Sequence, residues 1–377
     1  MNYDLLVVGR GILGLAHALA GLRHGLSVAV LDRETQAVGA SIRNFGFVTV
    51  TGQARGLTWR RAMRSRDVWD EIAPQAGISV LQQGFLMCAR RPEAVDVLED
   101  FLATEMGAAA GCRMVPRAQL PPGLHPGVLA GLHSPQERRV ESRDAIPRLA
   151  AWLAGQGVAF LPRATVTGVE RGRVNTPAGP IAAKRIVLCP GPDLTGLFPE
   201  EAAQRGVTLC KLHMLRVAAP PTPLAQPVMS DLGLLRYLGY HVSPRLPALR
   251  ARLEAEQGGA LADGVHLIAV AGADGSLVVG DSHHYGDTLG PFQPESVDAH
   301  ILDELTRVLD LPHPQVLERW VGYYPSGPEP MFTAAPLPDV RLVQVTSGTG
   351  ASTSFAIAEE TLADLLGQAP PHHTESQ

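Results

Sequence analysis

The sequence predicts an α/β fold, α+β overall, and three regions of the chain carry this prediction. Residues 3–32 run through an apolar stretch, a glycine-rich turn, a helical pattern and a second apolar stretch, which is typical of parallel strands joined by a helix. Residues 340–366 repeat the order of apolar stretch, glycine turn and helix. Residues 207–321 mix short extended stretches, loops and one helical pattern, which favours a second sheet of a different kind.

The composition limits the classes of protein that this chain can belong to. Its 377 residues fit two domains, or one large domain with an insertion. With 45% hydrophobic and 18% charged residues, global disorder is excluded. A net charge of −5 provides no basic field for nucleic acid. No apolar run reaches the roughly 18–20 residues of a membrane span, so we expect no membrane partner.

The four cysteines also narrow the class of site. They stand at Cys88, Cys112, Cys189 and Cys210, and none forms a C-x-x-C pair. This spacing disfavours zinc and dithiol chemistry and gives no sign of a disulfide framework. We therefore expect a cytoplasmic protein.

The first region carries a dinucleotide-binding pattern. An apolar strand at Tyr3–Val8 leads directly into Gly9–Gly14, which reads G-x-G-x-x-G. A helical pattern follows at residues 15–24, and a second strand at residues 27–31 ends at Asp32. The glycines permit a tight turn, close approach to a pyrophosphate and close helix–strand packing, while the acid accepts from ribose hydroxyls.

The pattern alone does not separate FAD from NAD. Arg33 follows the acid and suits a 2′-phosphate, but Asp32 before it argues against NADP.

Two later segments extend the pattern. Residues 165–184 read as a three-stranded antiparallel meander that runs into an apolar strand ending at Pro190 and Gly191. Near the C-terminus, a strand at Val340–Val345 precedes a glycine turn and a helix at residues 353–366. This second strand–turn–helix predicts another site for an anion or a dipole.

Together these segments resemble the FAD-dependent amine oxidoreductases of the D-amino-acid oxidase superfamily, which includes glycine oxidase and sarcosine oxidase. The resemblance rests on Val8–Ala16, Leu31–Arg33, Ile186–Gly191 and Gly348–Gly350. It implies a Rossmann-like FAD-binding domain whose first turn holds the pyrophosphate and whose last turn faces the flavin pyrimidine. The cofactor-binding residues that it implies are Gly9, Gly11, Ile12, Leu13, Gly14, Asp32, Arg33, Ser41, Arg43, Asn44, Val166, Pro190, Gly191, Gly348, Thr349, Gly350 and Ala351.

The same resemblance implies non-covalent FAD. Members with covalent flavin attach it through a cysteine in the C-terminal part, whereas the last cysteine here is Cys210. The chain also departs from the superfamily, because Tyr323–Ser326 replaces a frequent Arg-Pro before the last strand. The segment after Gly350 lacks the proline or second glycine that is frequent there. These departures bear on the substrate more than on FAD.

The resemblance further implies a discontinuous domain organisation. The FAD-binding domain is expected at residues 1–80, 141–206 and 322–367, and the second domain, built on an antiparallel sheet, at residues 81–140 and 207–321. Within the second domain we expect a strand at 82–89, helices at 92–106 and 297–309, and interruptions by the prolines of 220–223 and by 244–255. Residues 368–377 are expected to form a disordered tail.

Two polar clusters predict the substrate. Within Gly39–Phe47 and Gly280–Gly286, the segments Arg43–Gly46 and Gly280–His283 resemble a subgroup associated with bacterial breakdown of 2-aminoethylphosphonate. This resemblance implies oxidation of that aminophosphonate or its N-methyl derivative. We predict that Arg43, His283 and Tyr285 orient the anionic substrate. The other candidates are Lys211, His213, Arg236, His241, His284 and Tyr324. Each could instead be an ordinary core or surface residue, and Ser41, Arg43 and Asn44 could belong to an ordinary surface loop.

A metal site is not expected. His283 and His284 are adjacent, so their side chains diverge on a strand, and no H-x-x-x-H or carboxylate cluster joins them. A G-x-S-x-G nucleophile motif is also absent.

Three functions remain open at this point. In the preferred one, FAD oxidises a small anionic amine to an imine, the imine hydrolyses to an aldehyde and ammonia or an amine, and dioxygen or another acceptor takes the electrons, dioxygen giving hydrogen peroxide. Glycine, sarcosine and D-amino acids are alternative substrates. The other two functions are an NAD-linked dehydrogenase and a non-catalytic flavoprotein. A homodimer is compatible with the sequence, which does not fix the oligomeric state.

Overall fold

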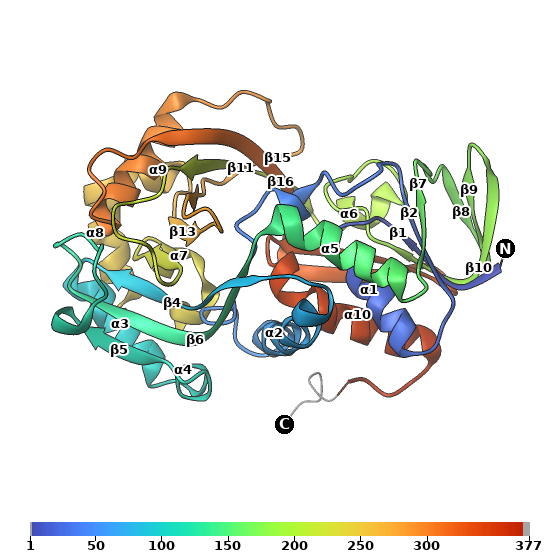
Figure 1. The fold of residues 1–377 in the computed structure, drawn as a ribbon, viewed down its shortest axis with the longest axis horizontal. Coiled ribbons are helices and arrows are strands. Elements are labelled where there is room, and N and C mark those ends of the chain that lie inside the picture. Colours follow the sequence, from blue (N-terminus) through green and yellow to red (C-terminus); the bar gives the residue numbers. More distant parts are fainter. Residues whose placement is uncertain (1, 372–377) are drawn as a thin grey trace.

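The computed structural model describes residues 2–371 and confirms the mixed α/β fold. Figure 1 shows two halves side by side, with the N-terminus at the outer edge of one of them. The first half contains β1, β2, β7, β10, α1 and α10, and the second contains β4, β6, β13, α3, α8 and α9.

The first half is built on a parallel sheet. Its strands pair in the order β7, β2, β1, β10 and β17, all parallel. Their bounds are β1 (Asn2–Val8), β2 (Val28–Asp32), β7 (Ala159–Pro162), β10 (Gly179–Leu188) and β17 (Val340–Ser347). The branched apolar runs predicted these strands because both faces of such a sheet are buried.

The predicted meander is present beside this sheet. It consists of β8 (Gly168–Glu170), β9 (Arg173–Thr176) and the start of β10, paired antiparallel. Its two turns fall at residues 171–172 and 177–178.

Helices pack against the parallel sheet and share one buried apolar cluster with it. They are α1 (Ile12–Arg23), α2 (Leu57–Gln75), α5 (Ser142–Gly155) and α10 (Gly350–Leu366). The helices α1 and α10 both begin three residues earlier than the apolar periodicity predicted, inside their glycine turns. As a result, both helix N-termini lie directly at the ends of strands.

The second half carries the rest of the sheet. Its strands are β3 (Phe47–Val48), β4 (Val80–Ala89), β5 (Arg113–Pro116), β6 (Ala130–Val140), β11 (Thr208–Val217), β12 (Val228–Ser230), β13 (Ile268–Ala271), β14 (Leu277–Gly280) and β15 (His284–Gly286). Most of the pairs are antiparallel, as expected, but β12 pairs parallel with β4. This parallel pair is an exception within the antiparallel pairing of the second half.

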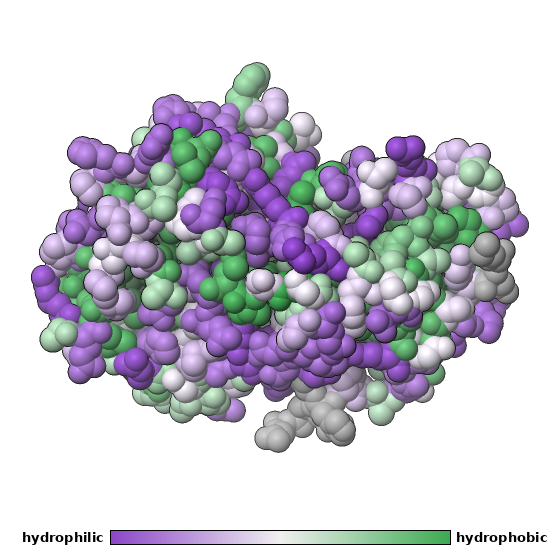
Figure 2. Space-filling view, viewed as in Figure 1, coloured by the Kyte–Doolittle hydropathy of each residue, from purple (hydrophilic) through white to green (hydrophobic). Residues whose placement is uncertain are grey.

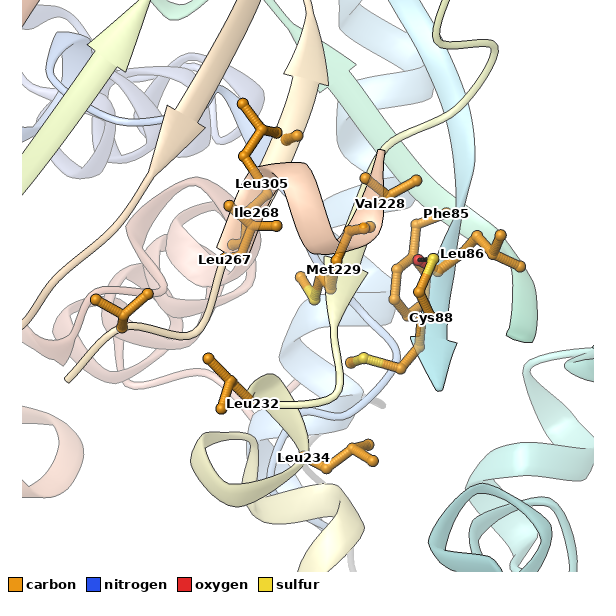
Figure 3. Close-up of a cluster of buried hydrophobic side chains, with 14 of the residues drawn as sticks. Phe85, Leu86, Cys88, Val228, Met229, Leu232, Leu234, Leu267, Ile268 and Leu305 are labelled. Atoms are coloured by element: carbon orange, nitrogen blue, oxygen red, sulfur yellow. Dashed lines mark hydrogen bonds between the residues drawn. The ribbon is translucent and has the colours of Figure 1, made fainter. Parts of the chain in front are cut away.

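The core of this half lies around that parallel pair. Figure 3 shows side chains of β4 opposite those of β12, with apolar residues from the neighbouring segments beside them. The labelled members are Phe85, Leu86, Cys88, Val228, Met229, Leu232, Leu234, Leu267, Ile268 and Leu305. All of them are buried, and full burial of such a side chain contributes about 1.5–3 kcal/mol.

Two helix predictions in this half were wrong. The helix expected at 92–106 is divided into α3 (Pro92–Leu102) and α4 (Glu105–Ala109), because the Thr104 hydroxyl accepts from the Gly107 N–H and starts a new helix. The expected interruption at 244–255 is instead most of α8 (Leu246–Ala262), whose proline stands in the first turn, where no backbone donor is needed.

The remaining helices are short, apart from α9. They are α6 (Pro199–Ala203), α7 (Gly233–Arg236) and α9 (Glu295–Val308), with 3₁₀ turns at Ala40–Ile42, Arg117–Gln119 and Leu238–Val242. The predicted disordered tail falls largely at 372–377, which lies outside the described residues.

One long strand joins the two halves. β16 (Val316–Leu337) pairs antiparallel with β11 through its first part and with β17 through its last part. The junction between the halves therefore lies along β16, which pairs with a strand of each half.

The surface is mixed in character. Figure 2 shows hydrophilic side chains over much of one face, smaller hydrophobic areas between them, and a notch in the outline between the halves. Among the described residues, no helix combines the length and the apolar character that crossing a membrane requires.

Candidate functional site

A cavity of about 470 Å³ lies at the junction of the two halves. The first half lines it with the Gly11–Gly14 turn, Gly191 and residues 344–352. The second half lines it with Arg236 at the end of α7 and the two residues after it, with His266 and with the segment that leads into β15. The loop 40–54 and the middle of β16 complete the wall.

The first glycine turn is closely packed at its base. Gly9 has a φ of +110°, and a Cβ there would lie 2.3 Å from the Cys189 carbonyl oxygen. A Cβ on Gly14 would lie 1.9 Å from the Gly9 carbonyl oxygen. Only glycine fits these two positions, so the N-terminus of α1 is held against the end of β10 and opens into the cavity.

Ser41 ties the loop 40–47 to this turn. Its Oγ accepts the backbone N–H of Ile12 at 2.9 Å, and a Cβ on Gly11 would lie 2.9 Å from the same oxygen. Gly11, Ile12, Leu13 and Ser41 all line the cavity, as a phosphate-binding turn requires.

Other predicted residues shape the loops beside the cavity. Asp32 accepts the N–H of Arg10 at 2.7 Å and that of Glu34 at 2.9 Å. Arg33 is exposed and pairs with Asp193 at 3.1 Å. The residues Gly9, Asp32, Arg33, Val166 and Pro190 do not line the cavity, so their cofactor contacts stay predictions.

Asn44 is occupied within its own loop. Its Nδ2 donates to the Ala40 carbonyl at 2.7 Å, and its Oδ1 accepts the Gly46 N–H at 2.6 Å. These bonds hold the loop shape, while the neighbouring Arg43 side chain has no hydrogen-bond or ion-pair partner among the described residues and lines the cavity.

The C-terminal glycine turn faces the same cavity. Gly348 has a φ of +73°, and a Cβ there would lie 3.2 Å from the Tyr324 ring. Thr349 precedes α10, and Trp69 Nε1 donates to the Ala351 carbonyl at 2.8 Å, which fixes the first turn of that helix. Gly348, Thr349, Gly350 and Ala351 all line the cavity.

The N-termini of α1 and α10 thus both lie at one cavity. Each carries unsatisfied N–H groups and a partial positive charge, which stabilise negative charge nearby. One terminus suits a pyrophosphate, and the other suits the negative charge that a flavin gains on reduction. The residues present fit FAD.

The other end of the cavity is lined by a cation between two phenols. Arg236 Nη1 donates to the Tyr285 hydroxyl at 3.0 Å, and Nη2 donates to the Tyr324 hydroxyl at 2.9 Å. Although burial opposes its charge, the surrounding Tyr324, Tyr285 and Asp281 raise the pKa of Arg236 above its usual range. Tyr285 is 53% exposed and stands at the mouth of the cavity.

His283 is buried in the cavity wall. Its Nδ1 lies 2.9 Å from the Gly264 carbonyl, and its ring packs beside those of His266, Tyr285 and Tyr324. The structure therefore brings all three predicted substrate residues, Arg43, His283 and Tyr285, to one cavity.

Sequence reasoning missed two residues of this wall. Asp281 stands two positions before His283, inside the polar cluster Gly280–Gly286, and that position was the available signal. His266 precedes β13 in an apolar stretch without any motif. The ligand-type atoms of His266, Asp281 and His283 lie within 4.8 Å of one another. The cluster therefore joins residues from different segments of the chain and is not formed by the adjacent pair His283 and His284.

Four other candidates do not line the cavity. Lys211 Nζ donates to the carbonyls of Gly290 and Phe292, both at 2.9 Å. His213 is buried against Asp298 at 3.2 Å, and the rings of His213 and His284 lie 5.5 Å apart. His241 bonds the Leu235 carbonyl at 3.0 Å.

Comparison with curated proteins finds sequence relatives of this chain. A bifunctional protein named ThiO/ThiG, from Nostoc sp., is 24% identical over 366 residues, which cover 91% of this chain and 49% of that protein. The chain therefore spans about half the length of the curated relatives that it matches.

Solved structures share the fold over nearly the whole chain. The glycine oxidase of Bacillus cereus superposes with a TM-score of 0.79 at 16% identity and covers 99% of this chain and 97% of its own. The L-α-glycerophosphate oxidase of Mycoplasma pneumoniae, solved with FAD bound, gives 0.74 at 17% identity and covers 100% and 98%.

The family comparison reaches the same span. Residues 4–365 match the protein family described as FAD dependent oxidoreductase. Both glycine turns and the cavity between them fall within the matched residues. The chain belongs to this family of FAD-dependent oxidoreductases, and FAD is its cofactor.

Proposed function

We propose that the protein oxidises a small anionic amine, that the best substrate is 2-aminoethylphosphonate or its N-methyl derivative, and that dioxygen is the final electron acceptor. One observation supports an anionic substrate. Arg43 and Arg236 both line the cavity, and neither lies within ion-pair distance of a carboxylate among residues 2–371. An arginine in a cavity without a counter-ion is a site for an anion.

FAD held at the two glycine turns would supply the acceptor for a hydride equivalent from the C–H bond next to the substrate nitrogen. The protein's own part is to bind, orient and desolvate. Arg236 is held by two tyrosine hydroxyls, so its remaining N–H groups keep a fixed direction. An anionic group bound there fixes one end of the substrate and limits where the amine can lie. The imine product takes up water and gives an aldehyde and ammonia or an amine.

Charge and donor number favour a phosphonate over a carboxylate. A phosphonate presents three oxygens and up to two negative charges, which matches two guanidinium groups and nearby hydroxyls. A carboxylate uses fewer of these donors. A phosphonate is also supported by one of the similar solved structures, because that enzyme is named for a substrate with a phosphate group, L-α-glycerophosphate. Glycine, sarcosine and D-amino acids are the competing substrates, while the family leaves the NAD-linked alternative without support.

We propose that FAD is bound non-covalently. Cys189 is the cysteine that lines the cavity, and burial raises the pKa of its thiol far above the usual range. A protonated thiol is a poor nucleophile. Acid precipitation of the yellow protein should therefore leave the flavin in the supernatant, and flavin that stays with the pellet would contradict this proposal.

We also propose that the two halves follow the expected domain boundaries. The parallel strands β1, β2, β7, β10 and β17 fall in 1–80, 141–206 and 322–367, and β4 to β6 and β11 to β15 fall almost wholly in the remaining segments. The two-residue strand β3 is the exception, because it pairs with β6 but falls in 1–80. β16 crosses the boundary at 322, which limits independent motion of the halves.

The proposed function is tested with a panel of amines. Purified FAD-loaded protein is mixed in air with 2-aminoethylphosphonate, its N-methyl derivative, glycine, sarcosine or D-alanine, and hydrogen peroxide and aldehyde are measured. The proposal expects peroxide with a phosphonate in preference to the carboxylates. Turnover of a carboxylate amine alone would overturn the phosphonate assignment, and no turnover with any of them would overturn the proposed function.

A further inference from the structure

We propose that Asp281 is the group that takes the proton from the substrate's ammonium, and that His266 and His283 position it. This inference rests on the proposed function and deepens it. Asp281, His266 and His283 are each more than nine-tenths buried, and all three line the cavity.

The geometry encloses the carboxylate between two imidazoles. Asp281 Oδ1 lies 3.1 Å from His266 Nδ1, and Oδ2 lies 3.7 Å from His283 Nε2. Neither Oδ1 nor His266 Nδ1 makes a well-aligned hydrogen bond within the described chain. No arginine or lysine among residues 2–371 lies within ion-pair distance of Asp281. A buried carboxylate in this position is short of a donor.

The protonation of His283 follows from its backbone partner. The Gly264 carbonyl can only accept, so His283 Nδ1 carries the hydrogen and Nε2 presents a lone pair toward Asp281. An ionised Asp281 and this nitrogen are both acceptors and face each other unfavourably. A proton on the carboxyl relieves that contact, so the site is built to receive one.

The electrostatic surroundings agree with this assignment. Burial raises the pKa of Asp281 to about 7, against the opposing charge of Arg236 on α7. Burial lowers the pKa of His266 and His283 well below the usual range, so both imidazoles are neutral. The other titratable groups coupled to this cluster are Cys210, Tyr237, Tyr285, Tyr324 and His284. None of these carries a charge near neutral pH.

The proton transfer balances without any further reactant. The substrate R–CH2–NH3⁺ and Asp281–COO⁻ become R–CH2–NH2 and Asp281–COOH. The N–H bond breaks, the electron pair stays on nitrogen, and the new O–H bond forms on the carboxyl. The free electron pair then assists loss of the neighbouring hydride, and the proton leaves to cavity water after product release. The positive charge of Arg236 disfavours the ammonium, while its effect on Asp281 is the opposite, because it also stabilises the ionised carboxylate.

A metal ion is the competing occupant of the same three side chains. Two imidazoles and a carboxylate are common metal ligands. Arg236, however, acts on all three groups with its positive charge, which lowers the affinity for a dication. We therefore assign the cluster to proton transfer and make bound metal an outcome of the test.

The first measurement is the pH profile of flavin reduction without oxygen. We compare wild type with Asp281→Asn, using 2-aminoethylphosphonate and stopped-flow detection between about pH 6 and pH 10. The variant should be slower at neutral pH by about 100-fold. It should recover toward the wild-type rate as the pH approaches the pKa of the free amine, since the substrate then arrives deprotonated. Asp263→Asn is the matched control, because Asp263 pairs with His300 at 2.8 Å and does not line the cavity.

The second measurement needs no substrate. Infrared difference spectra of the FAD-loaded protein should show a buried carboxyl that loses its proton with a midpoint near pH 7, absent from Asp281→Asn. Metal analysis of the same samples should find no stoichiometric dication. A missing carboxyl signal, or one dication per chain that is lost in His266→Gln, would overturn the inference.

The two experiments separate this inference from the proposed function. If an amine reduces the flavin and Asp281→Asn is slow by the same factor at every pH, the function stands and Asp281 is not the proton acceptor. If the carboxyl titrates but no amine reduces the flavin, the proposed function fails, and the role as proton acceptor fails with it.

Discussion

The two ends of the cavity are built on different principles. At the FAD end, the cavity wall is formed mainly by backbone. Two glycine turns bring the N-termini of α1 and α10 to one place, and each turn is local in sequence. At the substrate end, side chains from α7, β15, β16 and the segment before β13 meet across the sheet. The first arrangement tolerates few residue types at fixed spacing, whereas the second depends on strand register that no short motif encodes.

The largest effect should come from filling the first glycine turn. Gly14→Ala places a Cβ where the Gly9 carbonyl stands, 1.9 Å away, so the turn cannot keep its shape. We expect FAD affinity to fall by at least about 100-fold, which corresponds to roughly 3 kcal/mol, and the protein to purify colourless. The measurement is a flavin titration followed by fluorescence quenching. Gly39→Ala is the control, because nothing lies within 4 Å of a Cβ there, and equal FAD binding by both variants would contradict the packing argument.

The next effect should separate the substrate end from the FAD end. Arg236→Met removes the guanidinium that bonds Tyr285 and Tyr324 while leaving both glycine turns intact. Loss of a charge-assisted contact of about 1.5–3 kcal/mol predicts a 10- to 100-fold rise in KM for the phosphonate, with FAD content unchanged. Steady-state kinetics measure it, with Arg250→Met on the exposed side of α8 as control. An unchanged KM would place the anion elsewhere.

A stability measurement should show that the ionised Asp281 carboxylate lowers the free energy of unfolding at neutral and higher pH. The pKa of Asp281 is raised to about 7 in the folded protein, while an unfolded aspartate titrates near 3.9. Its contribution to stability is therefore fully present below about pH 4 and is lost as the pH rises through about 7. Relative to wild type, Asp281→Asn should gain up to about 4 kcal/mol between these limits. Urea unfolding at several pH values measures the difference, and a constant offset would argue against the raised pKa.

The smallest effect should come from the phenol at the cavity mouth. Tyr285 is half exposed and gives Arg236 one of its two acceptors. Tyr285→Phe should raise KM for the phosphonate only a few-fold, because Tyr324 still holds the guanidinium. Tyr324→Phe, at the buried position, should cost more in the same kinetic assay. The reverse order would show that the mouth, not the wall, fixes Arg236.

These differences explain how much the sequence could predict. The strands, both glycine turns and the fold class follow from apolar runs and glycine spacing, and the structure and the family match confirm them. Helix starts were placed three residues late because the glycine turns themselves are helical at their ends. Pro247 is a helix-breaking signal in the sequence, whereas in the structure it stands in the first turn of α8, where it does not interrupt the helix.

The substrate end could be predicted only in part. Arg43, His283 and Tyr285 stand in clusters of polar residues, and the sequence predicted them as substrate residues. All three line the cavity, and their contact with substrate stays a prediction. Arg236 stood among several equal candidates. His266 has no local signal, because its partner Asp281 comes from a different strand end. Long-range pairing of β11 with β14, β15 and β16 brings these residues together.

The sharpest test of the phosphonate site is the visible spectrum of the FAD-loaded protein, recorded without oxygen before and after addition of 2-aminoethylphosphonate or glycine. We expect the phosphonate to bleach the flavin bands of wild type far faster than glycine does, and Arg236→Met to lose this preference. Flavin bands that persist with the phosphonate but disappear with glycine would rule out the phosphonate site.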